Sequence, residues 1–316
     1  MAEFQSQNRR DFLRYMIGGA ALISGYPAFS KEIMVKKGVN KLTILYTNDV
    51  HSRIEPFATN DPKFPNQGGF ARRAAVINQI RAQEDNVLLL DAGDIFQGTP
   101  YFNMYAGELE YKLMTAMQYD CVTIGNHDFD LGMDNIVKQM PHAGFDFVCA
   151  NYIFTDTPLQ GRIKQYKIYN KAGLKIGVFG LGIELDGLVD KKLYGKTQYF
   201  NPVVVANDMV KTLKQEEKCD YVICLSHLGY KSEGKKINDQ TLAEQTHDID
   251  LIIGAHTHTF LEKPIVKANS KSREVTVTQV GWAGIWLGRF DVFFSGNTKK
   301  QTNLSSNIVV DRKWDI

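Results

Sequence analysis

The chain has 316 residues, of which 44% are hydrophobic and 23% charged, and its formal net charge is +2. This is the composition of an ordinary globular protein, long enough for one large domain or two small ones. So small a net charge gives no strong attraction toward nucleic acid, and we expect no nucleic-acid polymer as a partner. Beyond residue 30 no stretch reaches 18 uninterrupted apolar residues, so we expect no membrane span in the mature chain.

Residues 1–30 differ in character from the rest of the chain. Residues 8–14 are charged, residues 15–25 form a short apolar run, and residues 27–30 offer a plausible cleavage site. The core Arg9-Arg10-x-Phe12-Leu13 resembles a bacterial twin-arginine export signal. We therefore expect an exported, periplasmic protein, with an amphipathic N-terminal helix as the alternative.

Strands and helices are predicted to alternate along the body of the chain. The strands are expected at residues 42–46, 87–90, 121–124, 145–150, 162–169, 174–180, 221–225 and 249–253. The helices are expected at residues 70–83, 106–118, 133–142, 202–217 and 239–247. Strands are also predicted at 274–279 and 285–294. Residues 296–316 are predicted to form a polar extension with one weak strand at 307–310. This order predicts an α/β sandwich with two sheets inside and helices outside.

Five of the predicted strands end in polar residues that can bind a metal ion. In open α/β sheets, ligands bind beyond the carboxyl ends of the strands, so we expect all five ends to meet at one edge. Five of the seven histidines of the chain lie in these segments. The segments are Thr47-Asn48-Asp49-Val50-His51, Asp91-Ala92-Gly93-Asp94, Gly125-Asn126-His127-Asp128, Ser226-His227 and Gly254-Ala255-His256-Thr257-His258.

The residue types in these segments indicate two metal ions rather than one. A mixture of His, Asp and Asn suits zinc, manganese or iron rather than calcium, and the segments hold no thiolate of the kind usual in structural zinc sites. About seven ligands fit two divalent metal ions with open positions, and one carboxylate, such as that of Asp94, can bridge both. Such a pair typically cleaves phosphate esters. His127 is well placed to stabilise the leaving group, and Asp128 or Asp130 could orient its imidazole.

Taken singly, each segment has a simpler explanation. Asp49 and His51 could be polar loop residues, Asn126 a helix cap, and His227 a hydrogen-bonded core histidine. Only the combination, in this order, predicts a metal centre. His142 and His247 are expected to be structural, and Trp282 and Trp286 to lie in the core or on a sheet surface rather than to stack on bases. The four cysteines, Cys121, Cys149, Cys219 and Cys224, are expected to be free, buried thiols.

With these segments named, the chain resembles the calcineurin-like metallophosphoesterases, and within them the N-terminal catalytic domain of 5′-nucleotidases. The resemblance covers residues 41–295. It also includes Gly68-Gly69-Phe70-Ala71-Arg72 and Leu287-Gly288-Arg289. It implies the metallo-dependent phosphatase fold, a four-layer α-β-β-α sandwich of two mixed sheets flanked by helices.

The resemblance also implies a role for each site residue. One metal would be bound by Asp49, His51, Asp94 and His258, and the other by Asp94, Asn126, His227 and His256. His127 would be the catalytic histidine, paired with Asp130. A hydroxide that bridges the metals would attack the phosphorus directly, without a phospho-enzyme.

Two departures from the 5′-nucleotidase pattern affect what can be expected. Asp128 stands where that branch more often has Glu, and we expect no C-terminal domain of the kind that would hold the nucleoside after residue 295. We therefore expect a two-metal phosphomonoesterase of the 5′-nucleotidase type, acting on a nucleotide or another small phosphate ester, with a separate polypeptide supplying the nucleotide clamp. A cyclic-nucleotide phosphodiesterase or nucleotide-sugar hydrolase on the same core is the nearest alternative. A non-catalytic binding subunit is the alternative of another class.

Overall fold

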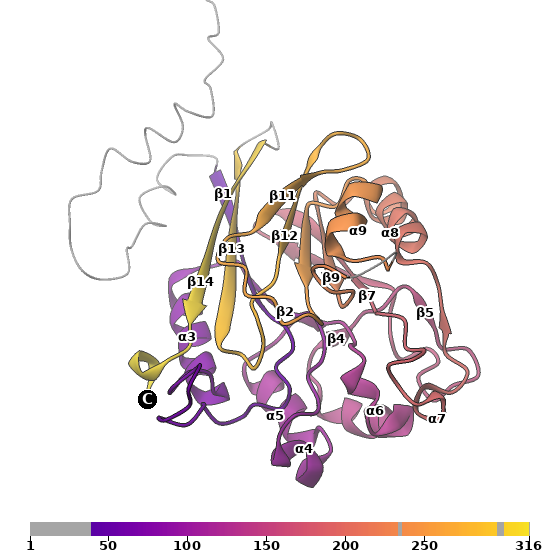
Figure 1. Cartoon of the computed structure of the whole chain (residues 1–316). Helices are drawn as coiled ribbons and strands as arrows, with labels where there is room; N and C mark the ends of the chain where they lie inside the picture. Colours follow the sequence, from indigo (N-terminus) through magenta and orange to yellow (C-terminus); the bar gives the residue numbers. More distant parts are fainter. Residues whose placement is uncertain (1–38, 233–235, 296–299, 316) are drawn as a thin grey trace, which may run out of the picture. The chain divides into compact units, whose positions relative to one another are not determined.

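A computed structural model describes residues 39–232, 236–295 and 300–315 (Figure 1). The predicted export signal at residues 1–30 lies outside these ranges. Within them, no helix combines the length and the apolar character that a membrane crossing requires.

The first of two six-stranded sheets brings together the two ends of the described chain. Strands β1 to β4 run parallel, whereas β13 is antiparallel to β1 and β14 is antiparallel to β13. In spatial order the strands are β14 (Lys300–Val309), β13 (Trp286–Ser295), β1 (Val39–Thr47), β2 (Val87–Asp91), β3 (Cys121–Val122) and β4 (Asp146–Phe147).

The second sheet has four parallel strands in its centre and an antiparallel strand at each edge. Its spatial order is β11 (Ile265–Ala268), β12 (Glu274–Thr278), β10 (Leu251–Gly254), β9 (Tyr221–Ser226), β7 (Leu174–Leu181) and β6 (Tyr166–Lys171). A separate pair, β5 (Tyr152–Ile153) and β8 (Gln198–Tyr199), is antiparallel. Both large sheets are therefore mixed.

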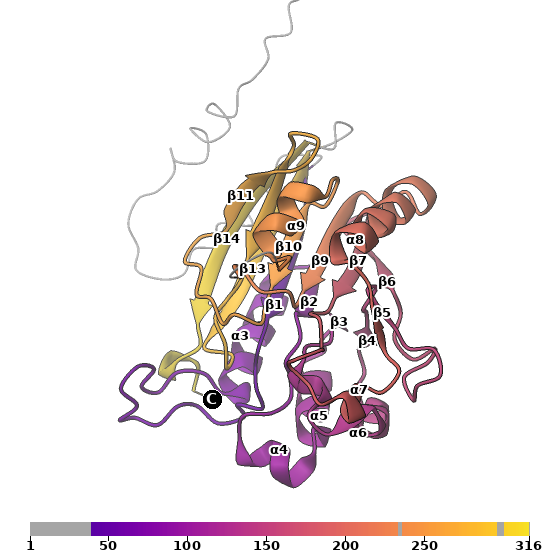
Figure 2. The same ribbon diagram turned by 45° about the vertical axis from the view of Figure 1, so that its right-hand side comes forward.

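The two sheets pack face to face, and helices cover their outer faces (Figure 2). In β1, Leu42, Ile44 and Tyr46 join a buried cluster shared with the second sheet, while Leu45 joins the cluster on the opposite face. Strands buried on both faces read as continuous apolar runs, as these do. The predicted four-layer sandwich is confirmed. Its helices are α3 (Phe70–Gln83), α4 (Pro100–Tyr105), α5 (Glu108–Ala116), α6 (Gly132–Gln139), α7 (Lys191–Tyr194), α8 (Pro202–Lys211) and α9 (Asp239–Gln245).

Local signals set several element boundaries. The Asn201 side chain caps α8 by accepting hydrogen bonds from the backbone of Val203 and Val204, with Pro202 in the first turn, as the sequence predicts. The helix predicted at 106–118 is present as α5, and a separate helix that was not predicted, α4, precedes it. The break between them falls at Ala106 and Gly107, both of which have left-handed backbone. A β-carbon on Gly107 would overlap the ring of Phe96.

The C-terminal segment differs most from its prediction. The polar extension with a weak strand at 307–310 is in fact a ten-residue strand, β14, which pairs with the whole of β13. Residues 303–306 are exposed, and burial begins to alternate only near Ile308 and Val310. An exposed edge strand gives no apolar signal, so only its last residues could be recognised. By contrast, the expectation of four free, buried cysteines is confirmed.

Candidate metal centre

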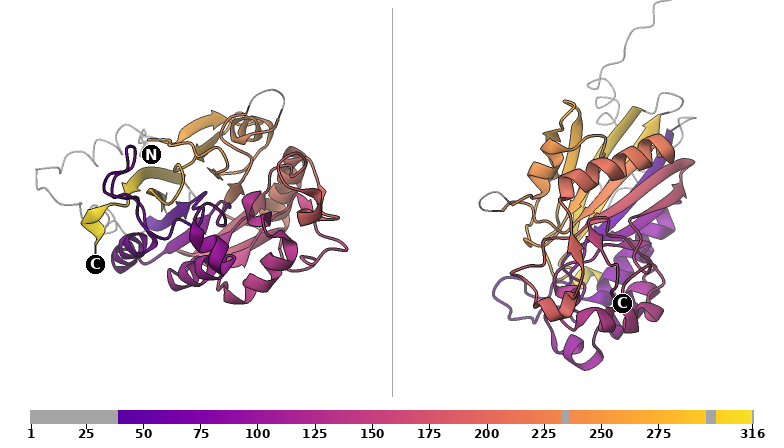
Figure 3. Two further views of the ribbon diagram at one scale, coloured as in Figure 1. Left: turned by 60° about the horizontal axis from the view of Figure 1, so that its bottom comes forward. Right: turned by 90° about the vertical axis from the view of Figure 1, so that its right-hand side faces the viewer.

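The five predicted strand ends meet at one end of the domain, which Figure 3 (left) turns toward the viewer. Three of them follow β1, β2 and β3 of the first sheet, and two follow β9 and β10 of the second. The sheets are joined here directly, because the backbone N–H of His256 donates to both carboxylate oxygens of Asp49, at 2.9 and 3.0 Å. The predicted convergence on one edge is therefore present.

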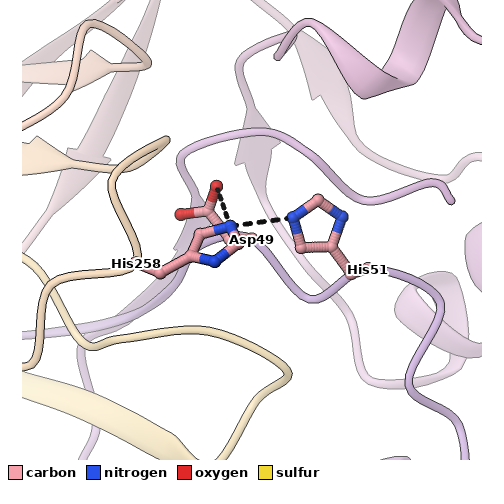
Figure 4. A group of neighbouring side chains, drawn as sticks. All are labelled: Asp49, His51 and His258. Carbon is pink, nitrogen blue, oxygen red and sulfur yellow. Dashed lines mark hydrogen bonds and ion pairs between the residues drawn. The ribbon is translucent and has the colours of Figure 1, made fainter. Parts of the chain in front are cut away.

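A first group of possible ligands consists of Asp49, His51 and His258 (Figure 4). Their donor atoms all lie within 4.8 Å of one another. His51 Nε2 is 3.0 Å from His258 Nε2, and His258 Nε2 is 3.6 Å from Asp49 Oδ1. The carboxylate is fully buried, whereas the side chain of His258 is 40% exposed. This group therefore opens to solvent on the side of His258.

A second group consists of Asp94, His227 and His256, again with donor atoms within 4.8 Å of one another. His227 Nε2 is 3.1 Å from Asp94 Oδ2. Asn126 joins this group, since its Oδ1 lies 2.9 Å from His256 Nδ1. The seven residues expected as ligands thus lie in two neighbouring groups, which is compatible with the division that the family resemblance implies.

Asp94 faces both groups. Its Oδ2 lies 3.1 Å from His227 Nε2 and 3.8 Å from His51 Nε2. Its Oδ1 accepts a hydrogen bond of 2.8 Å from the backbone N–H of His127. This is the position that a bridging carboxylate needs.

The histidine hydrogen bonds show that the donor set fits divalent cations. His227 Nδ1 is 2.8 Å from the carbonyl oxygen of Ala92, and His51 Nδ1 is 3.2 Å from that of Phe96. A ring that donates from Nδ1 keeps a lone pair on Nε2, which is the usual arrangement for a metal-binding histidine. His227 Nε2 is buried and has no hydrogen-bond partner. A buried ring nitrogen beside two carboxylates suits a metal ion.

The ionisation of these groups reflects how tightly they are packed. Burial alone would raise the pKa of Asp94, but His227 and His51 hold it well below its usual value. Burial lowers the pKa of His227. The carboxylates of Asp94 and Asp49 raise it more strongly, so the pKa of His227 is about 10. Burial and neighbouring histidines lower the pKa values of His256 and His258 to about 4. Without metal, a protonated His227 therefore supplies the positive charge that the carboxylates require.

The ligand loops contain several strained backbone positions. Five of the seven predicted ligands adopt left-handed backbone: Asp49 (φ 48°), His51 (φ 47°), Asp94 (φ 56°), His256 (φ 68°) and His258 (φ 52°). Such conformations cost about 1 kcal/mol or more each in residues other than glycine, and they persist where the surroundings enforce them. Here the loops brace each other, because Asp49 N–H donates to Gly93 O and His51 N–H donates to Asp94 O.

His127 and Asp130 form the predicted pair. His127 Nδ1 is 3.0 Å from Asp130 Oδ2, and this hydrogen bond is the main cause that raises the pKa of His127. The His127 side chain is 39% exposed and its ring centroid lies 5.3 Å from that of His51. It therefore stands beside the ligand groups and remains accessible to a bound molecule.

Asp128 has a role that sequence reasoning missed. It is turned away from His127 and accepts four backbone hydrogen bonds, from Asp94 (3.1 Å), Ile95 (3.0 Å), Phe96 (3.1 Å) and Gly125 (2.8 Å). Its carboxylate thus holds the loop that carries Asp94. The only sequence signal was an acidic residue next to a predicted catalytic histidine, which did not reveal its partners.

Two histidines and one tryptophan from the sequence analysis remain to be located: His142, His247 and Trp282. His247 lies outside the ligand groups, with Nδ1 3.1 Å from Asp248, and His142 lies in a short 3-10 helix, Met140–His142. Trp282 is not a sheet-surface residue. It lies in the loop before β13, and its ring is stacked on His258.

Comparison with known proteins agrees with this geometry. Residues 42–260 match the family model described as calcineurin-like phosphoesterase. The snake venom 5′-nucleotidase of Crotalus adamanteus is 31% identical over 302 residues, which are 87% of this chain and 49% of that protein. The 5′-nucleotidase of Homo sapiens is 31% identical over 283 residues, which are 81% of this chain and 47% of that protein. The chain thus spans about half the length of these curated relatives.

Solved structures give the same result. A 5′-nucleotidase precursor from Thermus thermophilus superposes with a TM-score of 0.79 and 29% identity, covering 87% of this chain and 55% of that one. The calcineurin-like phosphoesterase YfkN from Bacillus subtilis superposes with a TM-score of 0.71 and 26% identity, covering 86% of this chain and 91% of that one. On its fold, its two ligand groups and its sequence match, the chain belongs to the calcineurin-like phosphoesterase family.

Proposed function

We propose that the protein is a metal-dependent phosphoric ester hydrolase of the 5′-nucleotidase type, which releases phosphate from nucleoside 5′-monophosphates or related small esters. The observation that carries the proposal is the shared Asp94, which faces both ligand groups with His127 beside it. The curated relatives described above are named 5′-nucleotidase, which supports the same substrate class.

Each residue has a defined place in this proposal. Asp49, His51, Asp94 and His258 would bind one cation, and Asp94, Asn126, His227 and His256 would bind the other. Zinc, manganese or iron suits this donor set. Two such cations would lower the pKa of coordinated water and offset the charge on the phosphate.

The remaining chemistry belongs to His127. Asp130 accepts a hydrogen bond from Nδ1–H and favours the charged imidazolium, whose Nε2–H would remain free to face the ester. From there His127 would donate a hydrogen bond to a phosphate oxygen, or a proton to the departing alkoxide. Water is the nucleophile in this scheme, and no phospho-enzyme forms.

A substrate panel tests the proposal. Purified protein with added manganese or zinc should release phosphate from AMP and p-nitrophenyl phosphate faster than it cleaves bis-p-nitrophenyl phosphate, a cyclic nucleotide or a nucleotide sugar. Preference for a diester or a diphosphate would assign the same core to a phosphodiesterase or nucleotide-sugar hydrolase. If no ester is hydrolysed with either metal, the protein is a binding subunit and the proposal is wrong.

The variant His127→Ala separates catalysis from metal binding. It should lower kcat by about 100-fold or more, since a positioned general acid typically contributes that much. Metal content, measured by elemental analysis, should stay close to that of the wild type because His127 lies outside both ligand groups. Loss of metal in this variant would show that His127 is a ligand rather than a catalyst.

Two further expectations remain predictions. A separate polypeptide would add contacts to the nucleoside, so its presence should lower the KM for AMP. A low KM in the purified chain, with strong preference over p-nitrophenyl phosphate, would contradict this. Export by the twin-arginine route predicts that residues 1–30 carry a folded reporter into the periplasm, and that Arg9→Lys with Arg10→Lys abolishes the transfer.

A further inference from the structure

A cleft whose lining includes residues that closely follow His51 in the chain takes no part in the mechanism above. One wall is formed by residues 53–55 in the loop after β1. The other is formed by Pro100, Tyr101 and Met104 of α4 and by Thr99, which precedes this helix. The two walls are tied together, because the Thr99 hydroxyl donates to the carbonyl oxygen of Ser52 at 2.8 Å.

The cleft lies close to the point where an ester would be cleaved. Arg53 follows the predicted ligand His51 by two residues, and two residues span at most about 7 Å. His51 N–H donates to Asp94 O and Ser52 N–H donates to Ile95 O, so this segment is held firmly against the Asp94 loop. A phosphate bound between the ligand groups would therefore place its leaving group within reach of the cleft.

Arg53 presents a flat, pre-positioned cation to this space. Its guanidinium carbon lies 4.3 Å from the centroid of the Phe57 ring, and its buried Nε has no hydrogen-bond partner. A guanidinium group that is stacked on one aromatic ring can stack a second planar group on its free face. Because the side chain is already held in place, little conformational entropy is lost when a ligand binds.

Apart from Arg53 and Glu55, the lining of the cleft is largely apolar. Ile54, Pro100 and Tyr101 contribute apolar surface, and the side chain of Met104 is 71% exposed. An exposed methionine beside a polar site offers an adaptable contact for a ring. At the rim, the carboxylate of Glu55 accepts a hydrogen bond of 3.2 Å from Tyr101 and is exposed, so it can accept a further one.

We propose that this cleft binds the leaving group of the substrate and selects planar aromatic groups, such as a nucleobase, over aliphatic ones. This proposal rests on the phosphoesterase function above. It adds that this chain itself recognises the leaving group of the substrate. The ring would stack on Arg53 and contact Met104, and polar groups on its edge would face Glu55.

The test compares KM for AMP with KM for glycerol 3-phosphate, whose leaving group is small and aliphatic. Arg53→Ala should raise KM for AMP about tenfold, because stacking on a base typically contributes at least that much affinity. KM for glycerol 3-phosphate and the metal content should stay unchanged. Lys63→Ala is the matched control, since it removes one positive charge from the same loop outside the cleft.

A charge-retaining variant excludes the main alternative. Arg53→Lys keeps the positive charge but loses the flat guanidinium group, so it should resemble Arg53→Ala. If Arg53→Lys restores the wild-type KM for AMP, the cleft recognises an anionic group and the proposal is wrong. If Arg53→Ala leaves KM for AMP unchanged, or changes both substrates equally, the proposal is also wrong, while the hydrolase function stands.

Failure of the hydrolase function has a different signature. If no ester is cleaved, binding of AMP and of inorganic phosphate is measured by calorimetry with the intact chain. The cleft should make AMP bind more tightly than phosphate, and Arg53→Ala should remove that difference. Equal affinity of the wild-type chain for the two compounds would overturn the inference.

Discussion

The imidazole ring of His258 lies parallel to the indole ring of Trp282, with centroids 5.6 Å apart and planes inclined by only 8°. The rings of His51 and His227 are each oriented by a backbone carbonyl, and that of His256 by Asn126. For His258, stacking on Trp282 takes the place of such a hydrogen bond. Groups that orient a ligand in this way usually affect metal affinity.

Trp282→Ala should therefore weaken binding of the cation in the group of Asp49, His51 and His258. We expect about a tenfold loss of affinity for one of the two metals. Equilibrium dialysis with elemental analysis would measure this. Trp282→Phe keeps a flat ring and serves as the matched control. Two metals bound with unchanged affinity in Trp282→Ala would show that the stacking does not orient His258.

Asp94→Ala should remove both metals, because its carboxylate faces both ligand groups. Asn126→Ala is the comparison, since its amide contacts only the second group and should cost only one metal. Metal content after gel filtration distinguishes these outcomes. Full occupancy in the Asp94 variant would contradict a bridging carboxylate.

Asp128 and Asp130 lie two residues apart, and their substitution should have different effects. Asp128→Asn places an amide group against four backbone N–H donors and should lower the free energy of unfolding by about 3 kcal/mol. Asp130→Asn should leave stability close to that of the wild type, and lower the pH at which His127 loses its proton. Urea unfolding and the pH profile of kcat measure the two effects. Similar stability losses in both variants would refute this division of roles.

A buried acid below the second ligand group makes stability depend on pH. Asp239 is fully buried, accepts a hydrogen bond of 2.5 Å from Ser226, and its other oxygen has no partner. Burial raises the pKa of Asp239 to about 8, so its contribution to stability is full below pH about 4 and is lost as pH rises to about 8. The loss is at most about 1.4 kcal/mol per pH unit.

Asp239→Asn should flatten this dependence, because the amide does not titrate. The free energy of unfolding of metal-free protein, measured in urea at a series of pH values with a chelator present, should fall less steeply in the variant between pH 4 and 8. The same slope in both proteins would mean that Asp239 is ionised in the fold.

The strand ends could be predicted from the sequence because buried parallel strands are apolar and stop abruptly at polar residues. That rule alone predicts that Asp49, His51, Asp94 and His258 meet at one edge. The division of the ligands between two metals came from the resemblance to a known family, and the geometry agrees with it.

Other features depend on contacts that sequence does not show. Three of the four hydrogen bonds of Asp128 join segments more than 30 residues apart, and the stacking of Trp282 depends on where two loops meet. The break between α4 and α5 follows from the bulk of Phe96 against Gly107, which no helical propensity reveals. Strand β14 gives little signal because the side chains of residues 303–306 are exposed.

The pairing of β1 with β13 has a consequence for the order of assembly during synthesis. Val39 of β1 lies opposite Ser295 of β13. Strand β1 can therefore be paired on both sides only after β13 has been synthesised. Asp49 likewise depends on the backbone of His256, 207 residues later. A nascent chain would carry Asp49, His51, Asp94 and Asn126 long before it could complete either donor set. Metal binding as proposed would therefore be a late event, since either donor set is complete only once the whole domain has folded.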